Sequence, residues 1–161
     1  MPPGKSAVLV IGLGNEYRRD DAVGLIVARR LKEAAAEHVR VLEESGEGTA
    51  LMESWKDADA VILIDAVSSG ARPGTLRRFD AHRQPMPTEF FRCSSHTFSV
   101  AEAIELARAL GQLPPQLIVY GVEARDLEPG LGLSPEVETA AQEVVERVLG
   151  DIRRDSVLAQ S

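Results

Sequence analysis

The sequence has one cysteine, no long apolar run and no excess of basic residues. A lone Cys93 can form no internal disulfide, so nothing in the sequence indicates an oxidising compartment. No stretch approaches the ~20 apolar residues of a membrane helix. The first residues also lack the apolar core and cleavage site of a signal peptide. We therefore expect a cytoplasmic protein that does not enter membranes.

The charge balance and the composition narrow the class of protein further. Lysine and arginine number 18 against 25 aspartate and glutamate, a net charge of −7, which argues against non-specific binding of nucleic acid. The 161 residues are 44% hydrophobic and 27% charged, a balance that suits one globular domain. We find no internal repeat. The prediction is a single domain over residues 1–161, with a polar tail after about Arg154.

Apolar runs alternate with helical periods along the chain, which is typical of a parallel α/β sheet. Strands are predicted at 7–11, 38–42, 60–64, 75–79 (an edge strand or a hairpin arm) and 117–122. Helices are predicted from about Asp21, at 49–55, at 97–110 and from 135 to about 154, and 81–95 is predicted to be a surface loop. Right-handed crossovers favour a three-layer sandwich with a central, mostly parallel twisted sheet of about five strands flanked by helices.

Three polar residues are predicted to reach one rim of this sheet, because sites in such folds form at the carboxyl ends of strands. Asp21 opens the first helix, Asp65 follows the strand at 60–64, and His96 precedes the helix at 97–110. Two carboxylates and an imidazole suit a borderline divalent ion such as nickel or zinc, and they can also act as bases toward water.

Each of the three residues also has a purely structural interpretation. Asp21 is placed to interact favourably with a helix dipole, and Asp65 can bond backbone amides of a loop. His96 can simply stand at a helix start beside a capping Ser95. Cys93 lies near His96, but no basic cluster or helix start indicates a lowered thiol pKa.

The turn Gly12-Leu13-Gly14 after the first strand resembles part of a dinucleotide-binding motif. The third glycine of that motif would fall at Tyr17, and no convincing acid is present to bind a ribose. The glycines are therefore interpreted as residues of a tight turn, and a nucleotide-binding protein is the weaker alternative.

Taken in order, several motifs resemble those of the [NiFe]-hydrogenase maturation endopeptidases, over about residues 8–149. They are Gly12-Leu13-Gly14-Asn15, Asp20-Asp21-Ala22-Val23-Gly24, Ile64-Asp65-Ala66, Ser95-His96, Tyr120-Gly121-Val122-Glu123, Leu127-Glu128-Pro129 and Gly132-Leu133-Ser134-Pro135. The resemblance implies that Asp21, Asp65 and His96 are the catalytic and metal-contacting residues. An acidic segment of the family reads Ser45-Gly46-Glu47-Gly48-Thr49 here, so its acid is not carried over, although Glu47 is able to line the cleft.

The resemblance also implies the biology. Such a protease removes the C-terminal extension of the [NiFe]-hydrogenase large-subunit precursor after nickel insertion, and so completes its maturation. The nickel would be carried by the substrate, and another divalent metal would be able to occupy the site in vitro. Two alternatives stay open: a non-catalytic nickel-binding chaperone for hydrogenase assembly, and the nucleotide-binding protein.

Overall fold

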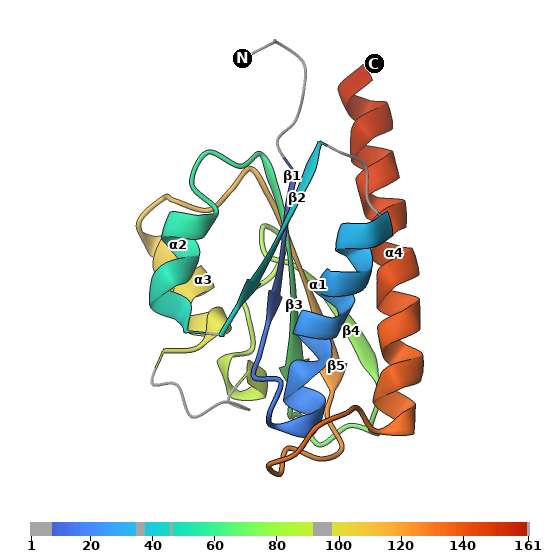
Figure 1. The fold of residues 1–161 in the computed structure, drawn as a ribbon. Coiled ribbons are helices and arrows are strands. Elements are labelled where there is room, and N and C mark those ends of the chain that lie inside the picture. Colours follow the sequence, from blue (N-terminus) through green and yellow to red (C-terminus); the bar gives the residue numbers. More distant parts are fainter. Residues whose placement is uncertain (1–7, 35–37, 46, 92–97, 161) are drawn as a thin grey trace.

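The described residues form one sheet of five strands in the order β2-β1-β3-β5-β4 (Figure 1). The computed structural model describes residues 8–34, 38–45, 47–91 and 98–160, with side chains described as far as Arg154. The strands are β1 Val8–Leu13, β2 Val39–Glu44, β3 Ala60–Val67, β4 Leu76–Asp80 and β5 Gln116–Glu123. All neighbouring strands are parallel except β4, which pairs antiparallel with β5 at the edge.

Helices cover both faces of the sheet, so the predicted α/β sandwich is confirmed (Figure 1). One layer consists of α1 Val23–Ala34, which follows the 3-10 turn η1 Arg19–Ala22, and α4 Pro135–Gln160. The other consists of α2 Leu51–Ser54, preceded by η2 Gly48–Ala50, and α3 Val100–Ala109. A further turn, η3 Thr88–Phe91, follows β4.

The central strand β3 is buried on both faces, as its unbroken apolar run predicts. Val61 and Leu63 pack in the core with α2 and α3, whereas Ile62 and Ile64 pack with α1 and α4. Because side chains alternate along a strand, Asp65 belongs to the face that carries Val61 and Leu63.

Helix α3 begins at Val100, three residues later than predicted. Ser99 is its N-cap: the Ser99 hydroxyl accepts the Glu102 N–H, and the Glu102 carboxylate accepts the Ser99 N–H. This reciprocal pair satisfies two backbone donors that the first turn would leave open. Ser95, the cap expected from the sequence, lies outside the described residues, as do His96 and Cys93.

The segment after β4 and the end of α4 also differ from the predictions. Within the predicted surface loop, Ala81, Met86 and Phe91 are buried in the core beneath α3. Helix α4 continues to Gln160, beyond about Arg154, where the sequence predicted that the helix frays into a polar tail. Ile152 is buried against the sheet, and the residues that follow are mostly compatible with a helix.

Among the described helices, none combines the length and the apolar character that crossing a membrane requires.

Candidate functional site

Glycines bring the start of α1 against the ends of β1 and β3. A Cβ on Gly24 would lie 2.3 Å from the Ile64 carbonyl oxygen and 2.4 Å from that of Leu13. A Cβ on Gly14 would lie 1.9 Å from the Asp21 carbonyl oxygen, and Gly14 has a φ of +145°. Gly12 and Leu13 belong to β1, contrary to the tight turn predicted at 12–14, and only Gly14 follows the strand. The glycines permit close packing, which places Asp21 at the carboxyl ends of the strands.

Asp21 lies in η1 and is only 2% exposed. Its Oδ2 accepts the backbone N–H of Asn15 at 3.0 Å and lies 4.0 Å from the Arg18 guanidinium. Both contacts favour a negative charge on this carboxylate. The helix-start position proposed from the sequence is correct, but here the carboxylate bonds the preceding turn.

Asp65 lies within β3, which continues three residues further than expected, to Val67. The pairing of β1 with β3 stops at Gly12 and Ile64, whereas the pairing of β3 with β5 continues to Val67 and Glu123. Asp65 is thus the first residue of β3 that has no partner in β1. At this end of the sheet, β3 contacts η1. Because β1 does not pair with β3 beyond Ile64, η1 packs against this end of β3, and Asp21 of η1 lies close to the Asp65 side chain.

The negative charge of Asp21 affects the pKa of Asp65. Burial raises the pKa of Asp65 well above its ordinary value, and the negative charge of Asp21 raises it further. The Ala66 N–H donates to Asp65 Oδ1 at 2.8 Å, which offsets only part of this shift. A buried pair of this kind can hold one proton and one negative charge, or it can be neutralised by a cation.

The third predicted site residue, His96, lies outside the described residues, so its role stays a prediction. Within the described ranges, no group of three or more His, Cys, Asp or Glu side chains is placed to hold a metal ion. Of the predicted ligand set, the described residues include the two carboxylates, Asp21 and Asp65.

Asp20 is a buried acid whose role the sequence reasoning missed. Its carboxylate accepts the backbone N–H groups of Arg125, Asp126 and Ser134 at 2.7–2.9 Å, and the Ser134 hydroxyl at 2.8 Å. Asp20 is fully buried, and its own N–H donates to the Asp126 carbonyl. It therefore anchors the loop between β5 and α4 beside the site. No local signal reveals this, because the donors are at least 105 residues further along the chain.

Two other acids lie near this rim. Glu123 is 3% exposed and accepts the N–H and hydroxyl of Ser69. Glu47 stands directly before η2, where the Gly48 N–H donates to the Phe98 carbonyl at 2.9 Å. The acidic segment after β2 thus lies beside the chain that leads into α3.

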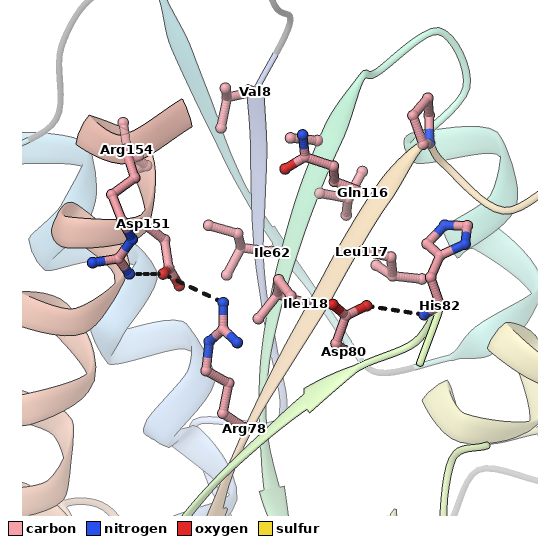
Figure 2. A pocket seen from close by; sticks show the side chains of 14 residues that line it. Val8, Ile62, Arg78, Asp80, His82, Gln116, Leu117, Ile118, Asp151 and Arg154 are labelled. Carbon is pink, nitrogen blue, oxygen red and sulfur yellow. Dashed lines mark hydrogen bonds and ion pairs between the residues drawn. The ribbon is translucent and has the colours of Figure 1, made fainter. Parts of the chain in front are cut away.

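A cavity of about 320 Å³ lies at the opposite rim, where β1, β3 and β5 begin (Figure 2). Arg78 and Arg154 both pair with Asp151 on its wall. The Tyr120 hydroxyl also donates to Asp151, and burial and this bond raise its pKa to about 12. These contacts attach α4 to the sheet edge, and they are remote from the carboxyl ends where Asp21 and Asp65 lie.

Solved structures with this fold include hydrogenase maturation peptidases. The chain resembles endopeptidase HybD of Escherichia coli with a TM-score of 0.78 at 27% identity, covering 92% of this chain and 93% of that one. A hydrogenase 2 maturation peptidase from Thaumarchaeota archaeon SCGC_AB-539-E09 gives a TM-score of 0.65 at 27% identity, covering 92% and 98%.

Sequence comparison defines the family. Residues 25–151 match the family model described as HycI, hydrogenase maturation protease. The chain is also 30% identical over 156 residues to the hydrogenase 2 maturation protease of Escherichia coli K12, covering 94% of both proteins. The chain therefore belongs to the hydrogenase maturation protease family and is a peptidase, as the motifs predict.

Proposed function

We propose that this peptidase removes the C-terminal extension of a [NiFe]-hydrogenase large-subunit precursor, and that Asp21 and Asp65 act at the scissile bond. The observation that carries the proposal is the convergence of these two buried carboxylates at the carboxyl rim of the sheet. His96 completes the proposed set.

The unequal surroundings of the two acids suit proton transfer. Asp21 is bonded to the Asn15 amide and lies near Arg18, whereas the raised pKa of Asp65 favours a protonated carboxyl. The ionised member accepts a proton from the attacking water, and the protonated member donates one to the leaving amide nitrogen. Breaking the C–N bond then yields a new C-terminal carboxylate and a free amine.

Nickel enters this scheme as part of the substrate. Two neighbouring carboxylates that repel each other fit a divalent cation, since the cation offsets the repulsion. Oxygen donors alone suit harder ions, and an imidazole such as that of His96 makes the set suitable for nickel. Bound there, the precursor's nickel would polarise the scissile carbonyl. A precursor without nickel would leave the site incomplete, which prevents a premature cut.

The proposal is tested by mixing the purified protein with nickel-loaded and nickel-free precursor and following the precursor by SDS gel and mass spectrometry. We expect the nickel-loaded precursor to become shorter by one defined C-terminal peptide, and the nickel-free precursor to stay intact. A nickel-loaded precursor that binds the protein yet keeps its full mass would contradict the proposal and favour a non-catalytic nickel chaperone.

A nucleotide-binding role has no support from these glycines, because Gly12 packs against Gly24 and Ala28 of α1 and Gly14 packs against Asp21. A thermal-shift comparison of NAD with divalent nickel separates the two alternatives. Stabilisation by NAD alone would favour nucleotide binding.

A further inference from the structure

Two large apolar side chains stand exposed beside the candidate site. Among the described residues, Tyr17 is 65% exposed and Leu131 is 68% exposed. Their segments lie side by side although they are far apart in sequence: the Gly130 N–H donates to the Tyr17 carbonyl at 2.9 Å, and the Arg19 N–H donates to the Gly130 carbonyl at 3.1 Å. A parallel bridge joins Arg18 to Gly130.

This backbone is firmly held. The buried Asp20 carboxylate bonds three amides and one hydroxyl of the loop that carries Leu131. On the other segment, the Tyr17 N–H donates to Asn15 Oδ1 at 2.9 Å. Because both segments are fixed, Tyr17 and Leu131 are presented to solvent without the ordering cost that a mobile loop would add on binding.

The pair is continuous with the proposed site through a single turn. The Asn15 N–H donates to Asp21 Oδ2, and the Asn15 side chain accepts the Tyr17 N–H. A polypeptide whose scissile bond reaches Asp21 therefore has to pass close to this turn. Large exposed apolar residues at such a position indicate a surface that is covered when substrate binds.

We propose that Tyr17 and Leu131 form a docking surface for the hydrogenase precursor, where they contact apolar side chains of the chain next to the scissile bond. This inference rests on the proposed function. A second copy of the protein is a poor occupant, since it would block the approach to Asp21 and Asp65.

The test measures the binding of nickel-loaded precursor and its cleavage with Tyr17→Ser, Leu131→Ser and the double variant. We expect the double variant to raise both Kd and KM about tenfold, a change typical of losing an interface anchor, with kcat and melting temperature nearly unchanged. Leu110→Ser is the matched control, because Leu110 is 55% exposed at the end of α3. It should leave Kd and KM unchanged.

The outcomes separate this inference from the proposed function. Unchanged Kd in the double variant, or a loss of kcat alone, would overturn the docking surface. A parent protein that binds precursor without cutting it would refute the proposed function, and the Kd series would still decide the docking surface. If sedimentation shows a dimer of the parent that the double variant loses, the occupant is a second copy and the inference is wrong.

Discussion

Two adjacent acids, Asp20 and Asp21, have opposite roles in this protein. Arg19 precedes them with a φ of +45°, a left-handed conformation that is uncommon for a residue with a side chain. Its N–H donates to the Gly130 carbonyl, which helps to hold that conformation. Asp20 bonds the loop before α4, whereas Asp21 lies near Asp65. This backbone conformation accompanies the divergence of the two carboxylates, one toward the loop before α4 and the other toward Asp65 and the proposed site.

The Asp65 carboxyl group should lower the free energy of unfolding at neutral pH in the metal-free protein. Its folded pKa lies well above the ordinary value, because of burial and the charge of Asp21. The folded state therefore holds the proton more tightly than the unfolded chain, so this group's contribution to stability is lost as pH rises through the folded pKa. Asp65→Asn removes the titration, and its amide oxygen is still able to accept the Ala66 N–H.

We expect Asp65→Asn to raise the melting temperature by more than about 3 °C at pH 8, roughly 1 kcal/mol for a chain of this size. The gain should shrink toward zero at about pH 4, near the unfolded pKa. Calorimetry of both proteins in EDTA across this range provides the measurement. A gain that does not depend on pH, or a loss at pH 8, would show that Asp65 is not destabilised by its charge.

At the scale of elements, unequal strand lengths create the site. β1 ends at Leu13, while β3 and β5 remain paired as far as Val67 and Glu123. The chain that leaves β1 turns through η1 and packs beside the unpaired edge of β3. The loop from β5 to α4 then lies against η1, because Asp20 bonds both ends of that loop.

This loop should depend on Asp20 for its stability. Asn has one acceptor oxygen where Asp20 has two, so Asp20→Asn leaves at least one buried donor among Arg125, Asp126 and Ser134 without its partner. We expect a loss of about 2–3 kcal/mol in free energy of unfolding. In this variant, the amides of Arg125 and Asp126 should exchange through local openings that need less free energy than those of the sheet amides, as measured by hydrogen exchange.

Glu143→Gln is the matched control for Asp20→Asn. It removes a carboxylate that pairs with Arg147 on the exposed surface of α4, where both side chains are 51% exposed. Its effect should stay within about 0.5 kcal/mol. If the two variants cost the same, the anchoring role of Asp20 is refuted.

At the scale of the whole molecule, the apolar runs were sufficient to predict the strands and the layers. For β4 the sequence left two alternatives, an edge strand or a hairpin arm, and the structure places it at the edge of the sheet. The strand order was not predicted, because it depends on how distant segments pack. The proximity of Asp21 and Asp65 follows from the rule that sites form at strand ends, and β1 and β3 are neighbours.

Other features required tertiary information. The partners of Asp20 lie more than a hundred residues away, and no local pattern signals them. The start of α3 was misplaced because Ser95 and Ser99 both precede helical residues, and only Ser99 has Glu102 three positions later to form a capping box. The end of α4 was placed too early because the polar residues after about Arg154 were interpreted as a tail, although the segment up to Gln160 contains no proline or glycine that would end a helix.

The central claim is that Asp21 and Asp65 perform the cleavage and do not maintain the fold. The decisive measurement pairs melting temperature with the rate of precursor cleavage for Asp21→Asn, Asp65→Asn and a core control, Val61→Ala. Val61 is 1% exposed in β3, so its truncation should cost about 1–3 kcal/mol yet leave the folded protein able to cut at the normal rate. The two carboxylate variants should stay folded and lose at least about a hundredfold in rate. An Asp65→Asn protein that stays folded and cuts within a few-fold of the normal rate, or one that unfolds, would contradict the account.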